Sequence, residues 1–374
     1  MTYEEIFLKR FCLTNFMSFH HCSVSFKPLT ILVGANGSGK TNFVFTLSAL
    51  KRMILANSFP PESFDLVWAG DSQGKTTFEI QMQLDENHVT YRLELQAHSN
   101  TPICVEKLYV NDVGVISVEN NDENGRGVIK DENGKNPIQY FPEGLALNSA
   151  YKYGSKPVTR AFVETIKSWN FFDLQPSKIR GNLSNFDGRM ESDGSGLKKI
   201  LSNFYDTDRE IFNSIRENVE VFTKGIKIVD ENGQLSLDEG YEKTIPLKFA
   251  SDGTVSFLAY QALLNQTQIS PLIVIEEPEK HFHPAAFVKL GRLLEELAQK
   301  TQVIITTHSS HLLNSLTKDS LGDTLAIFLL RNERGWGTQV INVEQEQNHN
   351  EALLGWIEDF GIGSAIFNSG IMEE

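Results

Sequence analysis

A glycine-rich segment, Gly34–Thr41, constrains this chain more than any other part of the sequence. It matches the pattern G-x-x-x-x-G-K-[ST] at every fixed position. The apolar run Leu29–Val33 before it predicts a buried strand, and Asn42–Leu50 after it predicts a helix. Strand, glycine loop and helix in this order are the context that a phosphate-binding loop needs. A glycine-rich turn without a ligand is the alternative, and the two flanks favour the phosphate loop.

The residues of this segment have separate roles in holding a nucleotide. The three glycines let backbone N–H groups curl around phosphates without a clash from a Cβ atom. Lys40 is placed to reach the β- and γ-phosphates, and Thr41 offers its hydroxyl to Mg²⁺. We therefore expect ATP and Mg²⁺ as ligands. The residues expected to contact the nucleotide are Gly34, Ala35, Asn36, Gly37, Ser38, Gly39, Lys40, Thr41 and Asn42.

Two adjacent acids follow a second predicted buried strand. The run Leu272–Ile275 ends in Glu276 and Glu277, and the carboxyl ends of strands are where α/β sheets bind ligands. Glu276 is placed to hold Mg²⁺ directly or through water, and Glu277 to polarise the water that attacks the γ-phosphate. Solvated charges at a strand end are the alternative. The phosphate loop upstream favours the catalytic interpretation.

A histidine follows a third predicted buried strand. His308 comes shortly after Val303–Thr306, and an imidazole at this position can hydrogen-bond the γ-phosphate or orient the attacking water. Lone histidines are more often structural, but the position of His308 at a strand end favours a functional role.

The segment Ser251–Thr254 opens a predicted helix and has two interpretations. Ser251 or Asp252 can be an N-cap of that helix. Alternatively, Ser251 and the N–H of Gly253 face a phosphate at the helix N-terminus. This segment is far along the chain from the phosphate loop, so a second molecule can supply it across a dimer.

His281 and His283 form an H-x-H pair without a third ligand at helical or hairpin spacing, so we expect no metal site of that type. His283 with Pro284 more plainly predicts the start of the next helix.

Alternating apolar and polar residues predict β-hairpins in the first part of the chain. The first covers residues 6–26, and three more pair 77–84 with 89–96, 104–110 with 113–118 and 127–130 with 137–141. Residues 158–168 predict a helix, the apolar spacing within 197–222 predicts two short helices or one bent helix, and 174–196 predicts a long loop. The later strands alternate with helices, which is typical of a parallel sheet. We expect an α/β fold with a mostly parallel core sheet, an antiparallel β lobe over residues 1–150, a mostly helical insertion over 151–240, and a lobe with the acids and His308 over 241–374.

Composition limits the possible partners and compartment. The chain has 374 residues, a net charge of −14 and an isoelectric point near 5.2, which argues against indiscriminate binding of nucleic acid. The three cysteines, Cys12, Cys22 and Cys104, form no C-x-x-C pair and suit a reducing compartment. We see no secretion signal, and no apolar run approaches the ~20 residues that a membrane helix needs. The expected location is the cytoplasm.

Together these motifs resemble the ABC-type ATPase head of the RecF, SMC, Rad50 and OLD group, and most closely its stand-alone AAA-like bacterial ATPases, many of them in anti-phage defence. The resemblance covers about the first fifty residues and about 245–330. It implies that Gly34–Thr41 is Walker A, Ile273–Glu277 is Walker B, Ala250–Thr254 is a degenerate signature motif, Glu279–Pro284 covers the D-loop and His308 is the switch histidine. The helices are too short for a long coiled-coil arm. Candidates for the glutamine loop are Gln81, Gln83 and Gln139.

The resemblance implies an ATP-driven switch. Two copies dimerise around ATP, hydrolyse it and control a separate effector, such as a nuclease, or a DNA-bound complex in genome maintenance or defence. OLD proteins carry a nuclease after the ATPase, and we expect none in this chain. The alternative is a RecF-like DNA clamp in which ATP only gates binding; a small-molecule kinase fits less well, because no acceptor site is visible. Leu353–Ile357 and Ile362–Phe367 can dock the effector or pack on the chain's own sheet.

Overall fold

The computed structural model describes residues 6–57, 67–71, 74–96, 103–119, 126–140, 144–152, 154–181, 188–231, 234–347 and 351–368. The chain forms two compact units. The first combines Met1–Trp169 with Ser320–Asn350, and the second combines Asn170–Asp319 with Glu351–Glu374. The sequence analysis placed lobe borders at residues 150 and 240 on the basis of motifs and secondary structure. These borders remain a prediction.

An antiparallel sheet with the strand order β2-β1-β4-β5-β6-β7-β8-β9 dominates the first unit. The hairpins expected from the sequence are all present in it. In the β6–β7 turn, Asn111 and Asp112 both have positive φ (48° and 65°), as a tight two-residue hairpin turn requires. The strands are β1 (Ile6–Phe16), β2 (Phe19–Ser25), β4 (Lys75–Leu84), β5 (Asn87–Gln96), β6 (Ile103–Val110), β7 (Val113–Glu119), β8 (Arg126–Ile129) and β9 (Ile138–Tyr140).

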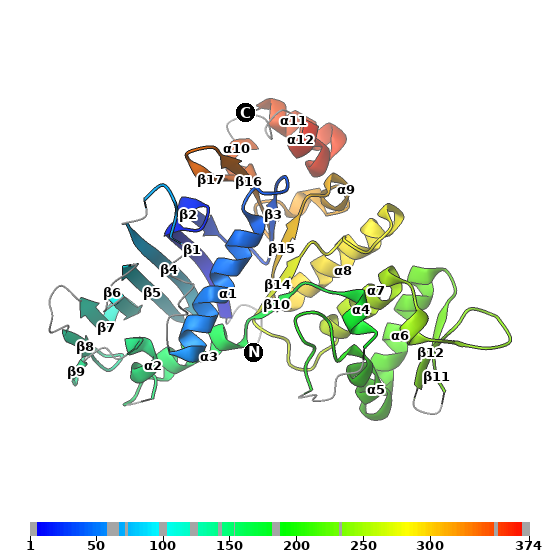
Figure 1. Cartoon of the computed structure of the whole chain (residues 1–374), viewed down its shortest axis with the longest axis horizontal. Coiled ribbons are helices and arrows are strands. Elements are labelled where there is room, and N and C mark those ends of the chain that lie inside the picture. The colour runs from blue at the N-terminus through cyan, green and yellow to red at the C-terminus, as the bar shows by residue number, and fades with distance from the viewer. Residues whose placement is uncertain are drawn as a thin grey trace. The chain divides into compact units, whose positions relative to one another are not determined.

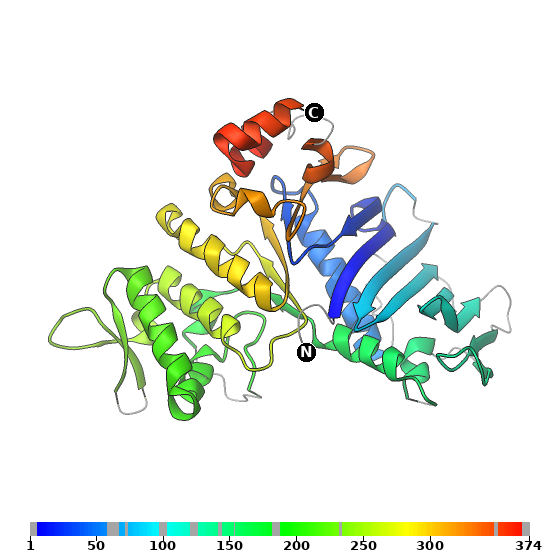
Figure 2. The same ribbon diagram turned by 180° about the vertical axis from the view of Figure 1, so that it is seen from behind.

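Helix α1 (Lys40–Ala56) lies along one face of this sheet (Figures 1 and 2). Its Phe43 is fully buried and meets two aromatic rings of the first hairpin. The ring of Phe11 lies 5.8 Å from it in an edge-on arrangement, and that of Phe19 lies 6.2 Å away. These contacts fix the helix that begins in the phosphate loop. Helices α2 (Ala146–Ala150) and α3 (Pro157–Ser168) complete this face.

Three further strands of the first unit lead into or pack against the phosphate loop. Strand β3 (Leu29–Val33) is buried along its whole length and pairs in parallel with β16 (Leu325–Glu333). Strand β17 (Gly337–Asn342) pairs antiparallel with β16 and is followed by α10 (Val343–Gln347). The continuous apolar run of β3 is typical of a parallel strand that is covered on both faces.

The second unit contains three parallel strands. Strand β14 (Leu272–Glu276) lies between β10 (Asn170–Phe172) and β15 (Gln302–Thr307). Glu276 is in register with Thr306, so the carboxyl ends of β14 and β15 meet at one edge. The helices that pack around them are α7 (Asp252–Leu264), α8 (Phe287–Lys300) and α9 (Ser310–Leu313).

The remaining elements of the second unit are mostly helical. The apolar spacing within residues 197–222 predicted two helices or one bent helix, and there are two, separated at Asp208, whose side chain accepts a hydrogen bond from Ile211 N and caps the second. The elements are α4 (Pro176–Ile179), α5 (Leu197–Thr207), α6 (Arg209–Thr223), β11 (Lys227–Glu231), β12 (Gln234–Asp238), β13 (Ile245–Pro246), α11 (Glu351–Phe360) and α12 (Ile362–Asn368).

The structure differs from the sequence expectations in two segments. Strand β10 was missed because its three residues give no measurable alternation. The stretch expected as one long loop contains the short helix α4, which begins at a proline that can occupy the first helical turn. Residues 182–187 of that stretch lie outside the described residues.

The C-terminal apolar segments pack within the second unit. Asn314, just after α9, accepts a hydrogen bond from Gly363 N (2.8 Å) and donates one to Ser364 Oγ (3.0 Å) of α12. Of the two interpretations left open by the sequence, α12 therefore packs on the chain itself, against a helix rather than a sheet. Within the described parts of the chain, no helix is long and apolar enough to cross a membrane.

A buried carboxylate ties the antiparallel sheet to α2. Glu106 is fully buried and accepts hydrogen bonds from Tyr91 Oη (3.0 Å), Ala146 N (2.7 Å) and Leu147 N (2.8 Å). Burial raises the pKa of Glu106 to about 7, and these three hydrogen bonds oppose that shift. Because the folded state holds the proton more tightly than the unfolded chain, Glu106 makes the protein less stable as the pH rises through about 7.

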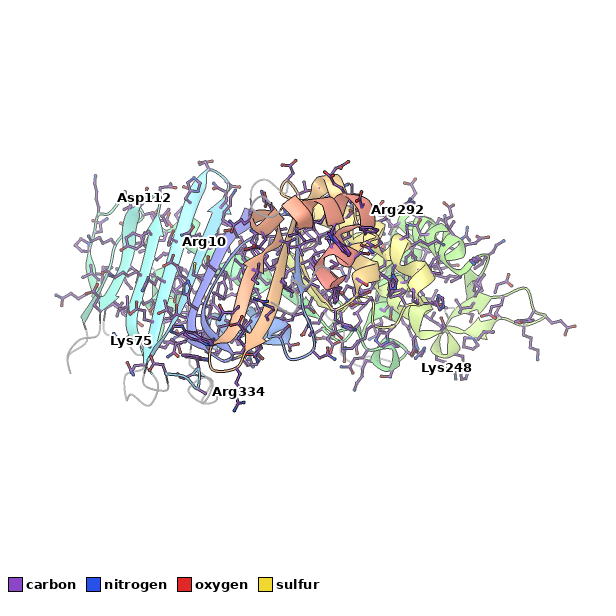
Figure 3. The ribbon with its side chains drawn as sticks, turned by 90° about the horizontal axis from the view of Figure 1, so that it is seen from above. Arg10, Lys75, Asp112, Lys248, Arg292 and Arg334 are labelled. Carbon is purple, nitrogen blue, oxygen red and sulfur yellow. The ribbon has the colours of Figure 1, made fainter. Side chains whose placement is uncertain are left out.

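We predict that the free energy of unfolding falls by roughly 1 kcal/mol between about pH 6 and about pH 8 because of Glu106 alone. The variant Glu106→Gln, which cannot ionise, loses this component of the pH dependence. Urea denaturation at the two pH values measures it, with Asp112→Asn in the exposed β6–β7 turn as the control (Figure 3). An unchanged pH dependence in Glu106→Gln contradicts the prediction.

Candidate functional site

The glycine loop has the backbone conformation that phosphate binding needs. It leads from the end of β3 to the first residue of α1. Gly37 and Gly39 have φ angles of 78° and 105°, in the left-handed region that favours glycine. A Cβ atom on Gly37 would meet no atom within 4 Å, so its backbone faces open space. The loop therefore exposes its peptide groups at the N-terminus of a 17-residue helix.

Close packing beneath the loop explains the other glycines. A Cβ atom on Gly34 would collide with the carbonyl oxygen of Leu330 on β16. A Cβ atom on Gly39 would collide with the side chain of Thr338 on β17. Both positions exclude any side chain, which fixes the loop against these two strands.

Lys40 is held within the loop by the loop's own carbonyl groups. Its Nζ donates hydrogen bonds to the carbonyl oxygens of Gly34 (2.7 Å) and Ala35 (2.8 Å). The side chain is buried, so these oxygens supply the partners that water would otherwise supply. Phosphate oxygens can accept hydrogen bonds from Lys40 Nζ in place of these carbonyl oxygens. The position of Lys40 is therefore compatible with the predicted contact to the β- and γ-phosphates. The next residue, Thr41, is exposed.

Three residues that the sequence analysis missed support the loop. Ser18, in the β1–β2 turn, accepts a hydrogen bond from Asn42 Nδ2 (2.8 Å). Thr338 Oγ1 forms hydrogen bonds with Ser18 Oγ (2.8 Å) and with the carbonyl oxygen of Ser38 (3.1 Å). Asn332 Nδ2 donates to the carbonyl oxygen of Gly37 (3.3 Å). No sequence signal links residues about three hundred positions apart, because their contact depends on the pairing of β3 with β16.

The acidic end of β14 has an unusual backbone. Glu277 has φ 43°, a left-handed conformation that is unfavourable for a residue with a Cβ atom. Its N–H lies 3.0 Å from the carbonyl oxygen and 3.2 Å from Oγ1 of Thr306 on β15. These contacts stabilise a turn in the backbone directly after Glu276, and this turn sets the direction of the Glu277 side chain. Backbone strain of this kind is frequent at functional sites.

The structure brings Glu277 and His308 together, as the sequence predicted for two strand ends at one edge. His308 Nδ1 lies 3.1 Å from Glu277 Oε1. The other carboxylate oxygen of Glu277 lies 3.6 Å from Lys280 Nζ. The imidazole is half-exposed, and the carboxylate is less so. This pair can orient a water molecule and accept its proton.

A third acid, Glu279, lies buried behind this pair. Its Oε1 accepts hydrogen bonds from Thr307 Oγ1 (2.5 Å) and from His308 N (3.4 Å). Its Oε2 is buried and has no hydrogen-bond partner among the described residues. Burial raises the pKa of Glu279. Sequence reasoning placed Glu279 in the D-loop region but did not anticipate that it holds the segment carrying His308.

The segment that opens α7 serves as the cap of its own helix. Ser251 Oγ accepts a hydrogen bond from Thr254 N (3.1 Å), which is the N-cap interpretation. Arg180 donates to the carbonyl oxygen of Ala250 and to the carboxylate of Asp252. The N-cap role does not exclude an anion at this helix end, so the role of Ser251 and Gly253 toward a second molecule stays a prediction.

The H-x-H histidines have structural partners. His283 Nδ1 accepts a hydrogen bond from Ala285 N (3.2 Å) and caps the helical turn that leads into α8, as the sequence predicted. His281 Nε2 lies 3.1 Å from the carbonyl oxygen of Leu174. The described part of the chain contains no group of three or more histidine, cysteine or acidic side chains that could hold a metal.

The glutamine-loop candidates have only local partners in the described contacts. Gln81 Nε2 lies 3.5 Å from Glu79 Oε1 on the same strand, and Gln83 Nε2 donates to the carbonyl oxygen of Asp85. Gln139 is exposed on the short strand β9. The position of a glutamine loop therefore stays a prediction.

Known proteins resemble the chain over both the phosphate-loop segment and the segment that carries the acids. Residues 7–157 match the model of the AAA ATPase domain. Residues 149–314 match the model described as AAA domain, putative AbiEii toxin, Type IV TA system. The SMC head domain from Thermotoga maritima has a TM-score of 0.50 and 16% identity over 90% of this chain and 98% of that chain. The Smc head crystallised with the C-winged helix domain of ScpA has a TM-score of 0.54 and 14% identity over 92% and 99%.

Two curated relatives complete the comparison. The Old nuclease of Escherichia phage P2 is 24% identical in an alignment 344 positions long that covers 81% of this chain and 56% of that protein. The chain thus resembles P-loop ATPases of the ABC, SMC and OLD type in its family matches, in this relative and in its fold. The Septu protein PtuA of Bacillus thuringiensis is 28% identical in an alignment 123 positions long that covers 29% of this chain and 29% of that protein. The chain thus spans about half or less of the length of these two relatives.

The comparisons confirm the expected α/β fold of an ABC-type head, and the structure builds it from mixed sheets and helices. The longest helix in the described residues is α1, with 17 residues, so this part of the chain contains no long coiled coil.

We predict that Glu279→Ala lowers the free energy of unfolding by about 1–3 kcal/mol, because it leaves the buried Thr307 hydroxyl and the His308 N–H without their acceptor. Glu279→Gln keeps an oxygen acceptor and costs less. Urea denaturation measures both variants, with Glu296→Ala on the exposed face of α8 as the control. Equal stability of Glu279→Ala and the wild type would sink the prediction.

Proposed function

We propose that this protein binds and hydrolyses ATP and uses the reaction as a switch that controls a partner. The observation that carries the proposal is the loop Gly34–Thr41, with its left-handed glycines and a buried Lys40 at the N-terminus of α1. The matches to AAA ATPase domain models support it. Both match ranges contain residues of the predicted site.

The residues of the loop fit a triphosphate. The backbone at Gly37 faces open space, and Lys40 already makes hydrogen bonds to oxygen atoms of the kind that phosphates present. Thr41 and Glu276 would hold Mg²⁺, since hydroxyl and carboxylate oxygens are the ligands that Mg²⁺ prefers. Mg²⁺, when bound, neutralises charge on the β- and γ-phosphate oxygens.

Hydrolysis in this proposal depends on the pair formed by Glu277 and His308. Glu277 accepts a proton from the water that attacks the γ-phosphorus. The bond from that phosphorus to the bridging oxygen breaks and leaves ADP and phosphate. His308, 3.1 Å from Glu277, orients the carboxylate and hydrogen-bonds the γ-phosphate. We propose that this pair and the phosphate loop act on one nucleotide.

The proposed switch is a homodimer. The N-terminus of α7, with Ser251 and Gly253, faces the γ-phosphate of the nucleotide held by the second copy. Ser251 Oγ accepts a hydrogen bond from Thr254 N within its own helix. The other N–H groups of the first helical turn have no partner within the helix, and in this proposal they bind the phosphate. Arg180, bound to Ala250 and Asp252, keeps that turn in place.

The proposed partner is a separate effector or a DNA-bound complex, in anti-phage defence or genome maintenance, in the cytoplasm. The relatives named a nuclease and a Septu protein support an effector of this kind. The alternative, a RecF-like clamp in which ATP only gates DNA binding, is tested by measuring whether the protein binds duplex DNA. In that case the isolated ATPase binds duplex DNA only with ATP, and the binding weakens as salt is raised.

We predict that Lys40→Ala lowers ATP affinity by at least about tenfold and abolishes turnover, because it removes the charge that meets the phosphates. Glu277→Gln keeps ATP binding but lowers turnover by roughly a hundredfold or more, since the amide cannot accept the proton of the water. Phosphate release and ATP binding are measured on the same preparations.

Two exposed variants are the controls for these measurements. Arg52→Ala lies on α1 beyond the loop, and Glu296→Gln lies on α8. Both are expected to keep wild-type turnover. Unchanged turnover in Lys40→Ala and Glu277→Gln contradicts the proposed function.

A further inference from the structure

An exposed tryptophan lies in the turn that joins β16 to β17. Trp336 is 69% exposed, whereas tryptophan is highly buried on average. Figure 3 shows the neighbouring Arg334 extending from this turn. The turn itself is well defined: Trp336 N donates to the carbonyl oxygen of Glu333 (3.0 Å), and Gly335 and Gly337 have φ angles of 84° and 79°. A rigid turn thus presents a large flat ring to solvent.

The residues after Trp336 fasten this turn to the phosphate loop. Thr338 N donates to the carbonyl oxygen of Ser18 (2.6 Å), and Thr338 Oγ1 lies 3.1 Å from the carbonyl oxygen of Ser38. A Cβ atom on Gly337 would collide with the same Ser18 oxygen. Two residues span at most about 7 Å of chain, so the backbone of Trp336 lies close to the loop that would hold the phosphates.

Two more aromatic rings border this turn. His20 and Trp68 form a tilted pair with ring centroids 4.7 Å apart. His20 is exposed and follows Ser18 by two residues. Trp68 Nε1 lies 3.0 Å from the position that a Cβ atom on Gly337 would occupy. The pair adds a donor N–H and ring nitrogens to the surface beside Trp336.

We propose that Trp336, with the His20–Trp68 pair beside it, binds the base of the nucleotide whose phosphates occupy Gly34–Thr41. The inference rests on the proposed nucleotide binding and adds to it the part of the site that recognises the base. All of its residues belong to the first unit. A base joined to the phosphates through a ribose must lie within a short reach of the loop, and this aromatic surface is hydrogen-bonded to that loop.

The chemistry of the surface favours a purine. Stacking of a base on an aromatic side chain stabilises the complex and tolerates different bases, because every base has a π-face. The larger purine ring covers more of an indole than a pyrimidine does. The surface is therefore expected to prefer purine over pyrimidine nucleotides and to discriminate weakly between adenine and guanine.

The test compares ATP with inorganic tripolyphosphate, which carries the phosphates and no base. Binding of each, in the presence of Mg²⁺, is measured by calorimetry for the wild type, Trp336→Ala and Trp336→Phe. We expect Trp336→Ala to weaken ATP binding about tenfold and to leave tripolyphosphate binding unchanged. Trp336→Phe keeps a stacking ring and restores most of the ATP affinity. Trp356→Ala, an exposed tryptophan on α11, is the control.

The outcomes separate this inference from the proposed function. If Trp336→Ala leaves ATP affinity unchanged, or weakens ATP and tripolyphosphate equally, the base site is wrong while nucleotide binding stands. If that variant keeps ATP affinity but loses dimer formation, Trp336 contacts another protein, which also overturns the base site. If the wild type binds neither ATP nor tripolyphosphate, the proposed function fails, and the base site fails with it.

Discussion

The absence of side chains at Gly34 and Gly39 is the constraint on which the phosphate loop depends. Each glycine lies so close to β16 or β17 that a Cβ atom would collide with a backbone oxygen or with Thr338. The loop can therefore lie only where these strands lie. Lys40 fits inside it by donating hydrogen bonds to two loop carbonyls, so contacts within the chain hold the loop in the conformation that phosphate binding needs. Such preorganisation lowers the cost of binding.

In the second unit, contacts within the chain likewise fix the positions of the acidic side chains. Glu277 is held in a left-handed conformation by Thr306, and Glu279 anchors the segment that carries His308. An isolated chain segment would not keep Glu277 in this conformation, because it is unfavourable for a residue with a Cβ atom. The packing of β14 against β15 therefore stabilises the geometry that brings Glu277 and His308 to 3.1 Å.

The parts of the site that the sequence predicted are those with a local signal. The loop, the acids after β14 and His308 each follow a buried apolar run, and turn residues such as Asn111 marked the hairpins. The parts that it missed depend on pairing between distant strands. Thr338 and Ser18 meet only because β16 pairs with β3 and β17 pairs with β16. The sequence placed Glu279 in the D-loop segment but did not indicate that its side chain is buried, since charged residues are rarely buried.

The central claim is that the loop and the acids act on one nucleotide and its metal ion. Electron paramagnetic resonance of Mn²⁺ in place of Mg²⁺, with ATP bound, tests it most directly. The account predicts one Mn²⁺ per ATP with coupling to phosphate phosphorus, and weaker Mn²⁺ binding in both Thr41→Ala and Glu276→Gln. Mn²⁺ binding that depends on Thr41 and is indifferent to Glu276→Gln would contradict the account, because the acids would then serve a different site.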